Sequence, residues 1–124
     1  MTPLEVARGH LAKAEEFLDE AQSALDAGHP SVAVSNAVIA GINSKDAMCL
    51  ALVGKTSKSD DHRQAVPDLR KAGKAGANLA TTLDRLLKPK TTAQYQAVPM
   101  AQRDAEVAVR QAGQLVAGAR AVLS

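Results

Sequence analysis

The chain has very little of two residue types that mark common functional classes. Its 124 residues include one cysteine, Cys49, which excludes an intramolecular disulfide. It has two aromatic residues, Phe17 and Tyr95, which argues against a single-strand binder that stacks successive bases on aromatic side chains. With so few aromatic residues, aliphatic side chains and alanine must build the hydrophobic core.

Long apolar runs are also missing. No segment reaches the ~20 consecutive apolar residues of a membrane span, and the N-terminus lacks the basic-then-apolar pattern of a signal peptide. We therefore expect a cytoplasmic protein that does not associate with membranes. At 124 residues, the chain is most simply one domain covering residues 1–124.

The histidines show no metal-binding pattern. His10, His29 and His62 lie far apart, and no two are spaced four residues apart on a helix. We expect His10 on the surface and His29 in a turn. No Ser-His-Asp set can be selected from the sequence either. The sequence therefore predicts neither a metal site nor a cofactor.

Two seams of alternating large and small residues predict closely packed helices at the two ends of the chain. The first helix begins near Pro3 and ends at Gly28, and Pro99 opens the last. The first seam consists of Leu4, Ala7, Leu11, Ala14, Leu18, Ala21 and Leu25. The second consists of Ala105, Val109, Ala112, Val116, Ala119 and Leu123. Small residues at alternate seam positions let a neighbouring helix approach closely.

Proline and glycine divide the middle of the chain into three further helices. The second helix runs from Pro30 to Leu52 or Val53, with Gly54 as its C-cap. A third begins near His62, capped by one of the aspartates at 60 and 61, and Pro67 makes it short or kinked.

A glycine turn separates the third helix from the fourth. Gly73 and Gly76 mark this turn, and the fourth helix stops before Pro89. No segment alternates with period two, so we expect no sheet. The predicted fold is an all-α, up-and-down antiparallel bundle of four to five helices.

Polar residues interrupt the apolar second helix along one side. Asn36, Asn43 and Asp46 are seven and three residues apart, which keeps them on one helix face. Because an unpaired buried carboxylate is costly, Asp46 should have a partner. These residues either hydrogen-bond within the bundle or across a dimer interface, or they bind a ligand.

Charge is distributed unevenly between the two halves of the chain. Residues 1–50 carry seven acidic and three basic residues, whereas residues 51–124 carry six acidic and twelve basic residues. The bases gather between Lys55 and Lys90. Such a region attracts phosphate or an acidic partner, although a mixed, solvated surface gives the same pattern.

Four segments, taken in order, resemble one known family. They are AVSNAVIAGINSKDAMCLALVG, DHRQAV, LLKPKTTAQY and DAEVAVRQAGQLVAGA, which lie between residues 33 and 119. They are similar to the second helix, the histidine-bearing start of the third, the basic segment after the fourth and the alanine-rich last helix of HEPN (higher eukaryotes and prokaryotes nucleotide-binding) domains. Asp46, His62, Lys90 and Tyr95 match polar positions of that family.

The resemblance implies a helical bundle that usually dimerises and contacts nucleotides or RNA. Many family members pair with a minimal nucleotidyltransferase in toxin–antitoxin systems, and several are metal-independent ribonucleases with an Arg-x4–6-His motif. None of the three histidines here follows an arginine at that spacing, and Asn36 occupies the position of the family's arginine near the start of the second helix. Lysine, as at Lys90, is a poor substitute for the planar arginine fork on phosphate.

Three functions follow from these observations. The first is a non-enzymatic, dimeric nucleotide- or RNA-binding module, paired with a nucleotidyltransferase. The second is a divergent ribonuclease toxin that uses His62 with Arg63 or a lysine. The third is a protein-interaction module without a nucleotide ligand. For a ligand, the candidate binding residues are Asn36, Asn43, Asp46, Lys55, His62, Arg63, Lys90 and Tyr95.

Overall fold

The structure, a computed structural model, describes residues 1–58, 62–88 and 100–124. Across these ranges the chain forms five helices and no strand. The helices are α1 (Pro3–Asp26), α2 (Pro30–Val53), α3 (His62–Arg70), α4 (Gly73–Leu87) and α6 (Gln102–Leu123). The prediction of an all-α bundle is therefore confirmed.

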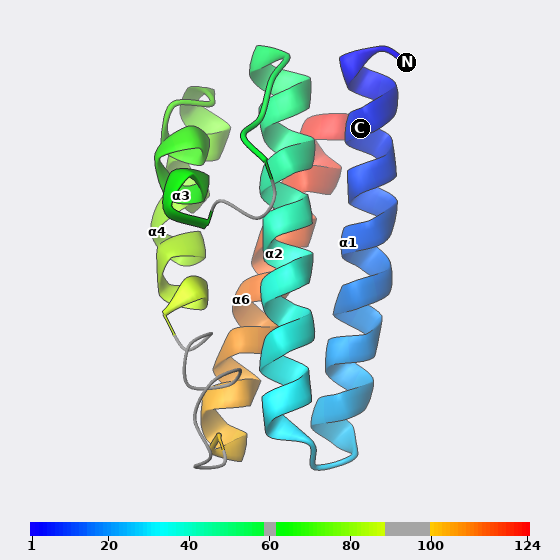
Figure 1. The fold of residues 1–124 in the computed structure, drawn as a ribbon, viewed down its shortest axis with the longest axis vertical. Coiled ribbons are helices and arrows are strands. Elements are labelled where there is room, and N and C mark those ends of the chain that lie inside the picture. The colour runs from blue at the N-terminus through cyan, green and yellow to red at the C-terminus, as the bar shows by residue number, and fades with distance from the viewer. Residues whose placement is uncertain (59–61, 89–99) are drawn as a thin grey trace.

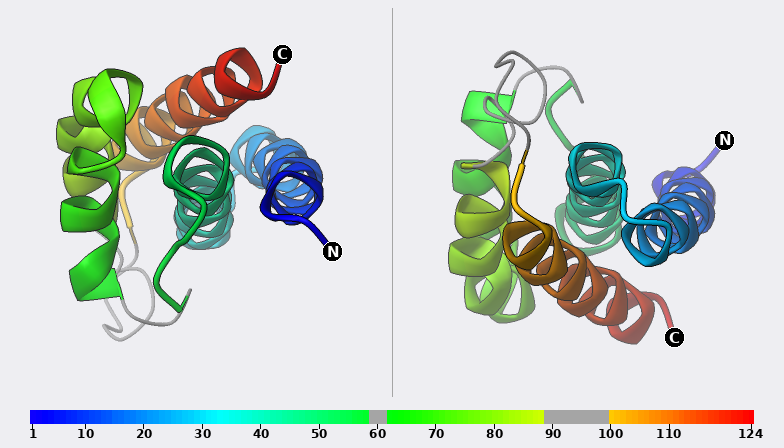
Figure 2. Two further views of the ribbon diagram at one scale, coloured as in Figure 1. Left: turned by 90° about the horizontal axis from the view of Figure 1, so that it is seen from above. Right: turned by 90° about the horizontal axis from the view of Figure 1, so that it is seen from below.

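Helix α2 is the centre of the bundle. It contacts α1, α6, α3 and α4, and Figures 1 and 2 show α1 on one side of it, the α3–α4 pair on the other and α6 behind. A helix that is surrounded on all sides must be apolar all round. This position explains why α2 is the most apolar of the five helices described.

Thr2, which the sequence analysis did not single out, and the predicted glycines set the ends of the two longest helices. The Thr2 hydroxyl accepts a hydrogen bond from the Glu5 amide at 3.1 Å, directly before α1. Gly28 and Gly54 follow α1 and α2 with φ of +76° and +77°, a left-handed conformation that glycine adopts without strain. The Gly54 amide also donates to the Leu50 carbonyl, which closes α2 as expected.

Two boundary predictions were wrong. Gly76 lies inside α4 rather than in a turn, and a Cβ there would collide with the Leu69 carbonyl oxygen. Glycine at this position permits the close approach of α3 and α4. The last helix begins at Gln102 rather than at Pro99, which lies outside the described residues.

Alanine forms the buried line of the α1 seam, and in the α6 seam Val109 and Val116 are buried as well. The seam alanines of α1 and α6, which are Ala7, Ala14, Ala21, Ala105, Ala112 and Ala119, are all 0% exposed. The seam leucines of α1 are less buried, and Leu4 is exposed. Close helix approach over alanine, rather than leucine interdigitation, therefore holds α1 against its neighbours. None of the helices described is long and apolar enough to pass through a bilayer.

Candidate functional site

The polar centre of the protein lies within the most buried part of α2. Ten consecutive residues, 40–49, are buried, and four of them are polar or charged. These four are Asn43, Ser44, Lys45 and Asp46. Their burial follows from the central position of α2, since each side of the helix faces another element.

Lys45 and Asp46 form a buried ion pair. The Lys45 Nζ atom lies 2.8 Å from Asp46 Oδ1, and each side chain is 1% exposed. The Thr56 hydroxyl bridges the pair, because it accepts from Lys45 at 2.9 Å and donates to Asp46 at 2.7 Å. Asp46 therefore has the partner that its burial requires, as the sequence predicted.

Residues 55–58, here called the strap, connect this ion pair to α3. The Ser57 hydroxyl accepts a hydrogen bond from Lys45 at 3.2 Å, and the Ser57 amide donates to Asp68 Oδ2 at 3.1 Å. Asp68 Oδ2 also lies 3.7 Å from the Lys45 ammonium. One buried lysine thus joins two carboxylates and two hydroxyls from three elements.

Asp68 is ionised by this environment. Partial burial acts to raise its pKa, but hydrogen bonds from Ser57 and the nearby Lys45 ammonium outweigh that effect and lower the pKa below its ordinary value of 3.8. Its side chain remains 24% exposed. It is therefore a negatively charged group that solvent can reach.

His10 completes the cluster on the α1 side. Its Nδ1 atom lies 2.9 Å from Asn43 Oδ1 and 3.9 Å from Asp46 Oδ2. The Asn43 amide nitrogen donates to the Ile39 carbonyl, so the Asn43 oxygen is the acceptor and His10 Nδ1 donates. The expectation that His10 is a simple surface residue was wrong, because its position on α1 places it against the polar side of α2.

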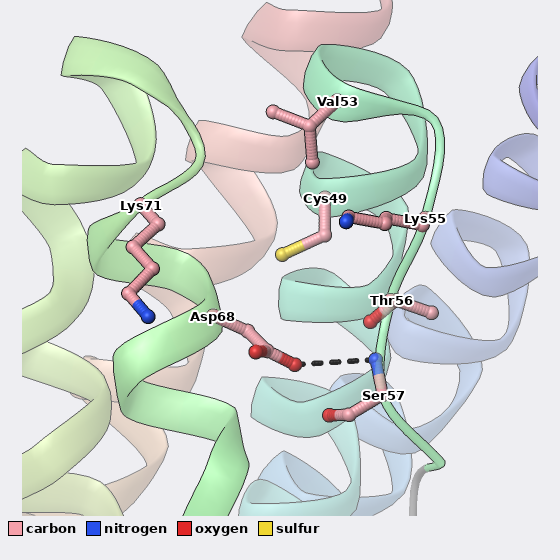
Figure 3. A pocket seen from close by; sticks show the side chains of 7 residues that line it. All are labelled: Cys49, Val53, Lys55, Thr56, Ser57, Asp68 and Lys71. Atoms are coloured by element: carbon pink, nitrogen blue, oxygen red, sulfur yellow. Dashed lines mark hydrogen bonds between the residues drawn. The ribbon is translucent and has the colours of Figure 1, made fainter.

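A pocket of about 520 Å³ opens beside the strap. It is lined by Cys49, Val53, Lys55, Thr56, Ser57, Asp68 and Lys71. In Figure 3 Lys71 approaches from the α3 side and Lys55 from the strap, with the Cys49 sulfur pointing into the space between them. The pocket therefore combines two exposed ammonium groups, an ionised carboxylate and a small apolar wall.

The Cys49 thiol is unreactive in this position. Burial, followed by the carboxylates of Asp68 and Asp46, raises its pKa from 9.0 to about 11, while Lys45 and the Thr56 hydroxyl act in the opposite direction. The thiol is therefore protonated at neutral pH. A protonated, buried cysteine is a small apolar surface rather than a nucleophile.

The predicted site residues do not all converge. Asn43 and Asp46 meet through His10, whereas Asn36 is half-buried and its side chain makes no hydrogen bond with the residues described. Lys55 lines the pocket. At the start of α3, His62 is half-buried and Arg63 is exposed. The remaining two candidates, Lys90 and Tyr95, lie outside the described residues.

Several residues of the polar centre and the pocket were not among the predicted site residues. They are His10, Lys45, Thr56, Ser57, Asp68 and Lys71. One signal was present for Lys45, because a lysine directly beside an aspartate within an apolar helix is a candidate buried pair. Lys71 belongs to the basic region between Lys55 and Lys90, which was noted only as a whole, and no sequence signal identified Asp68. Within the three described ranges, no group of histidine, cysteine, aspartate or glutamate side chains could hold a metal ion.

Comparison with known proteins identifies the family of this chain. No curated protein matches the chain. A family model described as the HEPN domain matches residues 7–121 of the 124. This range includes His10, the buried ion pair, the strap and the pocket. The chain therefore belongs to the HEPN domain family, whose domains are nucleotide- or RNA-binding or ribonuclease-type modules.

Proposed function

We propose that this HEPN domain binds a nucleotide or RNA at the strap pocket and does not cleave it. The observation that carries the proposal is the placement of Lys55 and Lys71 on opposite sides of one pocket (Figure 3). Two ammonium groups that face a shared space attract phosphate. The pocket volume of about 520 Å³ also lies in the range of small-ligand sites.

The buried polar centre supports this pocket rather than binding the ligand directly. Asp46 and Lys45 are each 1% exposed and bonded to one another, so neither can reach a ligand without an opening of the strap. Their role in the proposal is to fix Thr56 and Ser57 in place. Arg63 and His62 on α3, together with Asn36, Lys90 and Tyr95, remain candidates for contacts beyond the pocket.

We propose that the protein does not cleave RNA because of what its sequence lacks. Cleavage of RNA needs a proton-transfer group and a group that stabilises developing negative charge, both within reach of the substrate. Ribonucleases of the family supply these groups as Arg-x4–6-His, and no histidine of this chain follows an arginine at that spacing. The pocket itself is lined by lysine, carboxylate, hydroxyl and thiol groups, without a histidine.

One observation favours a ribonuclease as the second candidate. Six residues separate Lys55 from His62, which is the family's spacing with lysine in place of arginine. Lysine offers a point charge rather than a planar fork, so any activity should be weak. Cleavage of RNA by the purified protein that disappears in His62→Ala would establish this second function.

We further propose a homodimer that pairs with a minimal nucleotidyltransferase in a toxin–antitoxin system. The habit of the family supports this proposal, whereas the seam alanines are already buried within one chain and cannot form the dimer interface. Light scattering at micromolar concentration tests the dimer. Co-purification with the product of a neighbouring nucleotidyltransferase gene tests the partner.

The binding function is tested with charge-neutral variants. A Lys55→Gln/Lys71→Gln double variant should lose most of its affinity for short single-stranded RNA and for mixed nucleotides. A Lys13→Gln/Lys74→Gln variant removes the same charge from exposed positions outside the pocket and serves as the control. Affinity should fall steeply between about 50 and 300 mM salt. Failure of the native protein to bind any polyanion at the lower salt would leave the protein-interaction function instead.

A further inference from the structure

The strap pocket has separate features for three parts of one ligand. We infer that it selects a ribonucleoside monophosphate, with two lysines at the phosphate, one carboxylate at the ribose 2′-hydroxyl and an apolar wall against the base. The lysines are Lys55 and Lys71, the carboxylate is Asp68, and the wall is formed by Cys49 and Val53. The inference rests on the proposed function and adds the class of nucleotide that the pocket takes.

Asp68 is the residue that gives this selectivity. Its Oδ2 atom accepts the Ser57 amide hydrogen bond and faces Lys45, whereas Oδ1 takes part in neither contact. The side chain lines the pocket and is 24% exposed. Oδ1 is thus an anionic acceptor held in place by the bonds to Oδ2. Ribose hydroxyls and base amino groups both donate to such an acceptor, and with the base against the apolar wall a ribose hydroxyl is the donor that faces Asp68.

The Asp68 carboxylate also repels a ligand that carries only negative charge. Inorganic phosphate would meet the two lysines but would also approach Asp68. A nucleotide separates its phosphate from its hydroxyls, so the phosphate can lie between Lys55 and Lys71 while a hydroxyl faces Asp68. Mixed charge within one pocket therefore favours a ligand with an anionic end and a donor end.

The apolar wall of the pocket offers a surface for the base of the nucleotide. Cys49 is neutral and buried with its sulfur toward the pocket, and Val53 is 47% exposed next to it. A large aliphatic side chain left this exposed gains from being covered. The flat face of a base is an apolar surface of suitable size for this wall. No aromatic side chain lines the pocket, so stacking does not select among the bases.

Asp68 also has a structural role, and the experiment must separate the two. Asp68→Asn removes the charge and keeps the shape, and its amide oxygen can still accept from the Ser57 amide. If Asp68 has a purely structural role, Asp68→Asn should weaken the binding of every ligand by the same factor. A role in selectivity predicts a change in the ratio of affinities for ribose and 2′-deoxyribose nucleotides.

Isothermal titration calorimetry with AMP, dAMP and inorganic phosphate tests the inference. For the native protein, AMP should bind about tenfold more tightly than dAMP, because one hydrogen bond to a charged group is lost, and phosphate should bind more weakly than both. Asp68→Asn should reduce the AMP-to-dAMP ratio to about one. Lys71→Gln should weaken AMP and dAMP alike, and Lys74→Gln should change neither. Equal affinity of the native protein for AMP and dAMP overturns the inference.

A second measurement uses only the native protein, so its result does not depend on whether the Asp68→Asn variant folds. A ligand that binds only the folded protein raises its melting temperature. AMP should raise the melting temperature of the native protein, and dAMP at the same concentration should raise it less. Equal melting temperatures with and without AMP overturn the inference.

Short RNA distinguishes failure of the inference from failure of the function. RNA decamers with a 5′-phosphate and with a 5′-hydroxyl are titrated beside AMP. Binding of the decamers without binding of AMP overturns the monophosphate inference and leaves the RNA-binding function in place. Binding of neither AMP nor RNA at low salt overturns both. Stronger binding of the 5′-phosphorylated decamer identifies the end of an RNA strand as a second source of the same group.

Discussion

The two sides of α2 are held by different physical means. On the α1 and α6 side, alanines with 0% exposure let helix backbones approach closely. On the α3 side, a buried ammonium, two carboxylates and two hydroxyls connect α2, the strap and α3. The first side depends on many small, interchangeable contacts. The second depends on a few contacts in which each member satisfies another.

This difference predicts different responses to mutation. Removing one methyl group from an alanine seam leaves its other members in place. Removing one member of the polar centre leaves a buried charge without its partner, and that loss is large. Among the described residues, every buried side-chain nitrogen or oxygen atom has a hydrogen-bond partner. The polar centre is therefore completely paired. Four measurements test the comparison, in order of expected effect.

The largest effect should come from breaking the buried ion pair. Asp46→Ala leaves the Lys45 ammonium buried, with Asp68 at 3.7 Å as its remaining carboxylate neighbour, and should lower the free energy of unfolding by about 3–5 kcal/mol. Chemical denaturation measures the loss. Asp84→Ala is the matched control, because Asp84 pairs with Lys88 at 3.4 Å on the exposed surface. Equal loss in both variants would show that burial of the pair has no energetic importance.

Alkaline pH should destabilise the polar side next. The pKa of Cys49 is raised from 9.0 to about 11 in the folded protein, so above pH 9 the unfolded chain loses the thiol proton while the folded protein keeps it. Its contribution is fully present below pH 9 and is lost as pH rises to about 11, up to about 2–3 kcal/mol. Urea unfolding between these pH values measures it.

Cys49→Ala provides the control for this pH dependence. The variant keeps every other group that titrates at alkaline pH, so only the difference between the two stability curves reports on the thiol. The native protein should lose more stability than the variant between pH 9 and 11. Parallel curves would contradict the raised pKa.

Overpacking of the alanine side should have a somewhat smaller effect. Ala14→Leu adds three carbon atoms to a position with 0% exposure, and forcing extra methylenes into a packed interface costs about 1–3 kcal/mol. Ala12→Leu introduces the same side chain at an exposed position of α1 and is the control. A comparable melting temperature for both variants would show that the seam has free space.

The sequence predicted the helices well because their ends are fixed locally. Proline and glycine act within one or two residues of themselves, so Pro30 and Gly54 were sufficient to bound α2. Gly76 was misassigned because its reason is not local: the Leu69 carbonyl of another helix leaves no room for a Cβ. The same distinction between local and tertiary causes applies to the site.

The partner of Asp46 was expected, but its identity was not. Lys45 was not singled out, although a lysine beside Asp46 in an apolar helix is a candidate for a buried pair. His10 meets Asn43 only through the register of two antiparallel helices, 33 residues apart in sequence. Asn36 was grouped with Asn43 by helix face alone, yet seven residues rise about 10.5 Å along a helix. A shared face therefore does not place two side chains in one site.

The smallest effect should come from the one ion pair that links α1 and α6 among the described residues. Arg120 Nη2 lies 3.2 Å from Glu15 Oε2, and the two side chains are 56% and 40% exposed. Water and salt screen a pair this exposed, so a double-mutant cycle with Glu15→Gln and Arg120→Gln should give a coupling energy below about 1 kcal/mol. The coupling should shrink further at high salt. A value as large as the effect of Asp46→Ala would mean that charge, and not close packing over alanine, holds the α1–α6 side together.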